Sequence, residues 1–296
     1  MKRIVICVLC ILLICGCTAE NKAPTQEKMT IVTTTFPLYD FARQVCGEKA
    51  DVKMLIKPGS EVHTYDPLPS DMKSIYDSDL FICVGGESDK WVETMLDDMD
   101  ITVLSLIDCT AHHNHEHGEQ SHVDEHIWTS PQNAIKMIEK ICDSIVEIDS
   151  DNTTYYQKNC DDYVGKITTA SQQIKDCVSS CESPFILVAD RFPFAYFTDE
   201  YGIDYEAAFD GCAVSTDISL KTMSRLAKTI ETRGIKTVYV TELSSQNIAK
   251  ALRQEYGVKI VELHSAHNVT LKDFEAGISY VDILYRNCDA IEEGLK

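Results

Sequence analysis

The strongest constraint on the fold is an alternation of strand-like and helix-like segments that occurs twice, on either side of one long helical segment. In the first half, apolar or β-rich runs cover 29–36, 51–58, 80–86 and 101–108. In the second half, similar runs cover 184–190, 203–209, 236–242 and 258–263. Strands that alternate with helical crossovers build parallel sheets. We therefore predict an α/β protein with two (βα)₄ lobes, each with a parallel four-stranded sheet.

Residues 152–181 separate the two halves and contain no proline and a single glycine. Their apolar side chains recur every three or four residues, at Tyr156, Cys160, Tyr163, Ile167, Ala170, Ile174 and Val178. This spacing predicts an amphipathic helix, roughly 45 Å long at about 1.5 Å per residue. We interpret it as a stiff connector between lobes that face each other across a cleft; an ordinary surface helix of one large domain is the alternative. The predicted organisation is an N-terminal lobe at 29–150, a linking helix at 151–182 and a C-terminal lobe at 183–296.

The N-terminus has the pattern of a bacterial lipoprotein signal. Lys2 and Arg3 precede an apolar run from Ile4 to Ile14, which is short for a membrane span, and Cys17 follows a glycine. We predict a signal peptide at 1–17, a lipidated Cys17 and a polar tether at 18–28. The protein would then be extracytoplasmic and anchored to the bacterial cell membrane by lipid. A plain signal peptide with incidental cysteines is the alternative.

The formal net charge of the chain is −20 at neutral pH. A field of this sign repels nucleic acid and attracts cations, although simple solubility would explain it equally well. We expect no nucleic-acid partner, and we expect a monomer.

Three histidines follow predicted strands at matching places in the two halves. His63 lies after the second strand of the first half, His126 after its fourth strand, and His264 directly after the fourth strand of the second half, with His267 three residues further on. Ligands of open parallel sheets bind outside the carboxyl ends of the strands, so facing lobes would bring these imidazoles together. Neutral imidazole is a good Zn²⁺ ligand. We predict a metal site made by His63, His126 and His264, completed by water or a carboxylate.

A second group of histidines lies in a polar stretch at 111–122 that has no residues able to form a core. Its histidines are His112, His113, His115, His117 and His122. Tracts of this composition bind metal loosely. We interpret the stretch as an accessory metal loop; a low-complexity insertion without function is the alternative.

Two motifs carry a resemblance to a known family. Residues 57–71 read KPGSEVHTYDPLPSD around His63, and residues 124–131 read DEHIWTSP around His126. Over about 29–295 the chain resembles the zinc and manganese solute-binding proteins of ABC importers, of the high-affinity zinc-uptake type. The resemblance implies two (βα)₄ lobes joined by a long rigid helix, His63 and His126 as ligands, and an ABC permease and ATPase as partners. A His-rich loop ahead of the second motif is typical of the zinc members.

The second lobe departs from the family pattern. Arg191 stands where the family has a His or Glu ligand, and a guanidinium cannot coordinate a metal. His264 stands where the family has an Asp ligand. Asp190, Glu242 and Glu61 are the candidates for a fourth ligand, and we expect Arg191 to pair with one of them, for instance Glu242.

The function that these features predict is capture of Zn²⁺ outside the cytoplasm and its delivery to an ABC importer. A lipoprotein or adhesin that binds manganese or another divalent metal is an alternative, and so is a three-histidine zinc enzyme. The chain has neither an HExxH nor a GxSxG motif, so we predict that it is not an enzyme. Because imidazoles bind metal only when deprotonated, we expect affinity to fall as the pH drops through about 6.5.

Overall fold

The computed structural model describes residues 28–96, 100–110, 114–117, 120–209, 211 and 219–295. The predicted signal peptide, the lipidated Cys17 and nearly all of the tether lie outside the described residues. Within the described part of the chain, none of the helices combines the length and the apolar character needed to cross a bilayer.

The first sheet is parallel and has the strand order β2-β1-β3-β4. Its strands are β1 (Met29–Thr33), β2 (Ala50–Met54), β3 (Leu80–Cys83) and β4 (Val103–Ser105). Its helices are α2 (Phe36–Cys46), α3 (Pro69–Tyr76), α4 (Lys90–Leu96) and α5 (Pro131–Ile148), with short 3₁₀ turns η1 (Gly47–Lys49), η2 (Ile107–Cys109) and η3 (Ile127–Thr129). All four residues of β3 are buried, as its continuous apolar sequence predicts for a strand covered on both faces.

The second sheet is also parallel, with the order β10-β9-β7-β8. Its strands are β7 (Phe185–Val188), β8 (Asp204–Ala207), β9 (Thr237–Val240) and β10 (Lys259–Glu262). Its helices are α7 (Ala195–Tyr201), α8 (Leu220–Arg233), α9 (Asn247–Tyr256), α10 (Leu271–Glu275) and α11 (Tyr280–Leu295). The two sheets confirm the predicted α/β class and both sets of four parallel strands.

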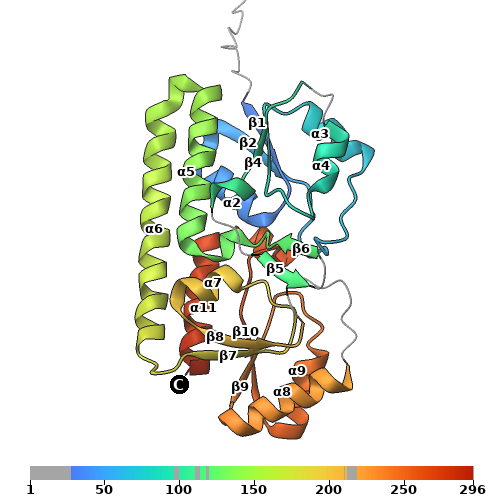
Figure 1. Cartoon of the computed structure of the whole chain (residues 1–296). Helices are drawn as coiled ribbons and strands as arrows, with labels where there is room; N and C mark the ends of the chain where they lie inside the picture. Colours follow the sequence, from blue (N-terminus) through green and yellow to red (C-terminus); the bar gives the residue numbers. More distant parts are fainter. Residues whose placement is uncertain are drawn as a thin grey trace, which may run out of the picture.

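One long helix, α6 (Thr153–Ser179), follows the short turn η4 (Ser150–Asn152) and runs alongside both lobes (Figure 1). The apolar positions that predicted it are all buried. It packs against α2 and α5 of the first lobe and against α11 of the second. A single hydrophobic core contains residues from both sheets, among them Ile31 of β1 and Val188 of β7. The lobes are therefore held together by a shared core as well as by the connecting helix.

A buried carboxylate ties three of these helices together. Asp40 of α2 is 0% exposed. Its Oδ2 accepts hydrogen bonds from the Tyr163 hydroxyl on α6 and from the Tyr280 N–H at the start of α11, the latter at 2.8 Å. Its Oδ1 accepts from Nε of Arg43 (2.8 Å), and Arg43 also donates to the carbonyl of Ile278 (2.5 Å). This network fixes α11, which ends the chain, against the first lobe.

An antiparallel hairpin interrupts the first lobe between η2 and η3. Its strands are β5 (Asn114–His117) and β6 (Gln120–Val123), and in Figure 1 it lies at the level where the two lobes meet. The hairpin comes from the His-rich stretch.

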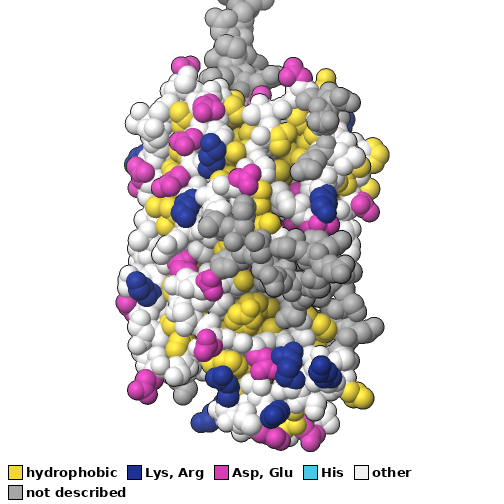
Figure 2. Space-filling view, viewed as in Figure 1, with side chains coloured by type: hydrophobic (Ala, Val, Ile, Leu, Met, Phe, Trp, Pro, Cys, Tyr) yellow, Lys and Arg dark blue, Asp and Glu magenta, His cyan; other side chains and the backbone are white. Residues whose placement is uncertain are grey.

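The surface charge is dispersed on the face that Figure 2 shows. Acidic side chains there are interspersed with lysines and arginines over both lobes. On this face the negative charge is therefore not gathered in one patch, and it attracts cations to the surface as a whole.

Candidate metal centre

Three histidines from the two lobes converge at one point. One ring nitrogen from each of His63, His126 and His267 lies within 4.8 Å of the other two. The ring centroids are 4.8 to 5.8 Å apart. His126 and His267 are buried, and the His63 side chain is 13% exposed. His63 lies beyond β2, His126 precedes η3, and His267 lies beyond β10, so the carboxyl ends of the strands in both lobes supply the cluster.

His264, which we predicted as the third member, is not part of this cluster. Its Nδ1 accepts a hydrogen bond from the N–H of Ala266 (2.9 Å) and lies 3.7 Å from a carboxylate oxygen of Glu242. The chain then turns at Ala266, which has a φ of 61°. This left-handed residue leads into His267, which joins His63 and His126. The structure therefore brings His267, three residues beyond the predicted His264 in the same loop, beside His63 and His126. Which of the two histidines binds a metal stays a prediction.

His126 is held by a neighbouring carboxylate. Asp124 Oδ1 lies 2.6 Å from His126 Nδ1 and also accepts from the backbone N–H of His126 (2.9 Å). Both side chains are buried. A carboxylate at Nδ1 fixes the proton there and leaves the Nε2 lone pair for a metal. The Trp128 ring packs against His126 and His267 and donates from Nε1 to the backbone of Ser265 (2.8 Å), which links the two lobes beside the cluster.

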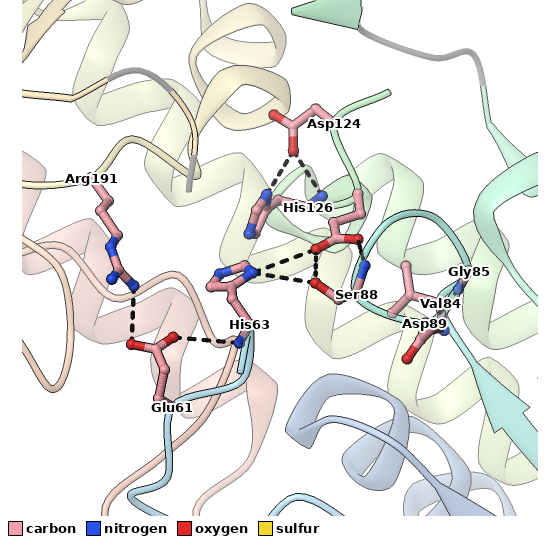
Figure 3. A network of polar contacts seen from close by, with 10 residues as sticks. Glu61, His63, Val84, Gly85, Ser88, Asp89, Asp124, His126 and Arg191 are labelled. Atoms are coloured by element: carbon pink, nitrogen blue, oxygen red, sulfur yellow. Dashed lines mark hydrogen bonds and ion pairs between the residues drawn. The ribbon is translucent and has the colours of Figure 1, made fainter. Parts of the chain in front are cut away.

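His63 is oriented in a similar way through a hydroxyl. Its Nδ1 lies 3.2 Å from Oγ of Ser88 (Figure 3). The Ser88 hydroxyl and backbone N–H both donate to the Glu125 carboxylate. Because the hydroxyl proton is directed to Glu125, Oγ is left to accept from His63 Nδ1, and Nε2 of His63 is free to bind a metal. Sequence reasoning missed Ser88, Glu125 and Asp124, although the two-residue spacing of Asp124 and His126 was a visible signal.

Burial favours the neutral form of two of these imidazoles, His63 and His267. Burial is the largest cause that lowers the pKa of His63 to about 4; the proximity of His126 and of the Arg191 guanidinium acts in the same direction, and the carboxylates of Glu61 and Asp124 act against it. Burial likewise holds the pKa of His267 well below its ordinary value, assisted by His126 and His63. A neutral imidazole keeps the lone pair that a metal needs.

Arg191 pairs with Glu61, one of the three carboxylates predicted as its partners; Glu242, the example given for that pairing, is not its partner. Nη1 of Arg191 donates to Glu61 Oε2 at 3.0 Å (Figure 3). Glu61 Oε1 in turn lies 3.4 Å from the backbone N–H of His63. The ion pair thus joins the His63 loop to the loop after β7.

The other two candidate carboxylates are engaged in holding loops. Glu242 accepts from the N–H groups of Ser265 (2.8 Å) and His267 (3.1 Å), so it positions the loop that carries His267. Asp190 accepts from the Thr241 hydroxyl (3.0 Å) and from the backbone N–H of Arg191 (2.9 Å). None of the three predicted carboxylates belongs to the close group of ligand atoms.

The cluster has the composition of a divalent-cation site. Among the described residues it is the one group of three or more His, Cys, Asp or Glu side chains gathered so closely. Zinc lies about 2.0–2.1 Å from imidazole nitrogens, which places tetrahedral ligands about 3.4 Å apart. If the three ring nitrogens moved about an ångström closer to one another, they would have the spacing of ligands around a zinc ion.

The predicted accessory loop is described in part. His112 and His113 lie outside the described residues. For His115, His117 and His122 only the backbone is described, and His115 is opposite His122 in the hairpin. A metal-binding role for these histidines stays a prediction.

Comparison with known proteins gives close relatives along the whole fold. The chain is 29% identical to the zinc-binding lipoprotein AdcA of Streptococcus pneumoniae over 99% of its own length, and it spans 61% of that protein. It is 28% identical to the high-affinity zinc uptake system protein ZnuA of Bacillus subtilis, covering 97% of this chain and 95% of the relative.

Solved structures of similar proteins superpose on this chain along nearly its whole described length. The crystal structure of the Zn(II)-bound ZnuA-like domain of Streptococcus pneumoniae AdcA superposes with a TM-score of 0.78 at 28% identity, covering 91% of this chain and 99% of that one. The metal-dependent lipoprotein YcdH of Bacillus subtilis superposes with a TM-score of 0.80 at 27% identity, covering 91% and 100%. Residues 31–294, nearly all of the described chain, match the family described as zinc-uptake complex component A, periplasmic, and the chain belongs to that family.

Proposed function

We propose that this protein captures Zn²⁺ outside the cytoplasm between its two lobes and delivers it to an ABC importer. The observation that carries the proposal is the convergence of His63, His126 and His267, two of them buried and all supplied by loops at the facing ends of the sheets. Relatives that match most of this chain are named for zinc binding and zinc uptake. Three nitrogen ligands suit zinc better than manganese, which prefers oxygen donors.

The remaining parts of the proposal concern the surroundings of the site. We propose an ABC permease and ATPase as the partners, and a lipid on Cys17 as the anchor that keeps the protein at the cell membrane. We also propose that the chain divides into lobes at 29–150 and 183–296, that residues 151–182 join them, and that the metal site lies between the two lobes. The His-rich stretch at 111–122 would concentrate zinc near the lobes.

Zinc binding by the soluble chain 18–296 tests the function. We expect one high-affinity site in calorimetry or in competition with a chromophoric chelator. His63→Ala should weaken it by roughly 100-fold or more, because a ligand is lost from a three-nitrogen set. Deletion of 112–122 should leave this site intact and remove only weaker zinc binding. A chain that binds no zinc, or an unchanged affinity in His63→Ala, would contradict the proposal.

The lowered pKa values change the expected pH dependence. Protons compete with zinc for the ring nitrogens, and three solvated imidazoles would together lose about 1,000-fold in affinity one pH unit below their ordinary pKa of about 6.5. His63, with a pKa of about 4, and His267, with a pKa well below the ordinary value, stay neutral in that range. We therefore expect the loss of affinity between about pH 7.5 and about pH 5.5 to be far smaller than about 1,000-fold.

The measurement is a chelator competition across this pH range, on the chain that lacks 112–122 so that exposed histidines do not contribute. A loss near 1,000-fold by about pH 5.5 would show that the rings titrate as solvated groups, as the sequence alone suggested.

A further inference from the structure

A cavity of about 370 Å³ lies beside the three-histidine cluster. His63 and His267 form part of its wall, and Arg191, Ser245 and Asn247 are among the polar residues on other parts of it. A water molecule takes up about 30 Å³ in the liquid, so a zinc ion with one bound water would fill a small part of this space. Cavities of about 300–1,000 Å³ are typical of sites for small organic ligands.

The guanidinium of Arg191 gives this cavity an anion-binding group. Its one described side-chain partner is Glu61, whose own side chain is 46% exposed, against 21% for Arg191. The Nε atom of Arg191 is buried, and it has no hydrogen-bond partner among the described residues. A buried donor without a partner is costly, so an acceptor that reached this N–H would offset that cost.

The protein supplies few groups that could complete the metal coordination from this side. Glu242 and Asp190 line the cavity but are held by backbone N–H groups and by hydroxyls of their own loops. Glu61 is bound to Arg191. The fourth coordination position of a zinc ion on the three histidines is therefore open to a ligand from the cavity.

The placement of Arg191 also matters electrostatically. The positive charge of Arg191, which Glu61 offsets, still repels a bound divalent cation to the extent that it is not balanced, and a further negative group between the two would weaken that repulsion. A carboxylate suits both neighbours, because zinc accepts carboxylate oxygen and the planar guanidinium fork matches a carboxylate.

We propose that the cargo of this protein is Zn²⁺ together with a small carboxylic acid of metabolite size. One carboxylate oxygen takes the fourth position on the zinc, and the acid is held in the cavity by Arg191. This inference rests on the proposed zinc site, which it extends from a bare ion to a metal–carboxylate complex.

Equilibrium dialysis with two labels tests it. The chain 18–296 is dialysed against radioactive zinc together with labelled citrate, L-histidine or inorganic phosphate, and the amount of each anion retained per bound zinc is measured. Arg191→Gln is the test variant. Arg225→Gln is the matched control. Like Arg191, Arg225 lies in the C-terminal lobe and is paired with a glutamate, here Glu206, but it does not line the cavity.

We expect about one molecule of carboxylic acid per bound zinc in the parent chain and in Arg225→Gln, and no retention of the acid when zinc is absent. In Arg191→Gln we expect the amount of acid per bound zinc to be at least about tenfold lower. Zinc bound without either carboxylate would overturn the inference and leave the zinc function standing. A ratio unchanged in Arg191→Gln would overturn the role of the arginine, and retention of phosphate alone would overturn the carboxylate class. A parent chain that binds no zinc would overturn the proposed function itself.

Discussion

Replacing His267 by alanine is expected to abolish high-affinity zinc binding, with a loss of roughly 1,000-fold, or about 4 kcal/mol of binding free energy. The imidazole is buried, neutral and within 4.8 Å of the other two ring nitrogens, so its removal leaves two protein ligands. Competition with a chromophoric chelator measures the change.

His264→Asn is the matched control for this substitution. His264 lies three residues away in the same loop; its Nδ1 accepts the N–H of Ala266 and lies 3.7 Å from a carboxylate oxygen of Glu242. An asparagine oxygen can accept the same kind of short-range bond, so the loop should keep its shape. We expect zinc affinity within about threefold of the parent chain. Loss of binding in His264→Asn with retention in His267→Ala would reverse the assignment and restore the prediction made from strand order alone.

Replacing Asp40 by alanine is expected to lower the free energy of unfolding by about 3–5 kcal/mol. The carboxylate is fully buried and accepts hydrogen bonds from Arg43, Tyr163 and the N–H of Tyr280. Its loss leaves the buried hydroxyl and N–H without their acceptor, in a place that joins α2, α6 and α11. Urea denaturation of the metal-free chain 18–296 measures the change.

Asp162→Ala provides the comparison on α6. Asp162 pairs with Lys158 on the exposed side of the helix, with 58% of its side chain accessible. Exposed pairs of this kind contribute about 0–1 kcal/mol. If Asp40→Ala were no more destabilising than Asp162→Ala, the network between the helices would have no role in holding the lobes together.

The fold was predictable because its signals are local. The buried spacing from Tyr156 to Val178 identified α6, and continuous apolar runs such as the one at 80–83 identified strands that are covered on both faces. The hairpin β5–β6 was not predicted, since a polar histidine-rich stretch has neither the alternation nor the apolar content that indicates a strand.

The candidate site was predictable in outline. Position after a strand predicted that His63, His126 and a histidine of the loop after β10 would lie together, as His63, His126 and His267 do. Their role as metal ligands stays a prediction. Strand order cannot distinguish His264 from His267, because the choice depends on the backbone turn at Ala266. The pairing of Arg191 with Glu61 joins residues 130 positions apart and depends on how the two lobes face each other. Such contacts follow from tertiary packing, which the spacing of motifs does not encode.

The most direct test of the central claim is a crystal structure of the zinc-loaded chain with anomalous scattering measured on both sides of the zinc absorption edge. We expect one strong zinc peak between the lobes, about 2.0–2.1 Å from one ring nitrogen each of His63, His126 and His267. A zinc peak bound by His264, or well-occupied zinc only at the histidine-rich stretch, would contradict it.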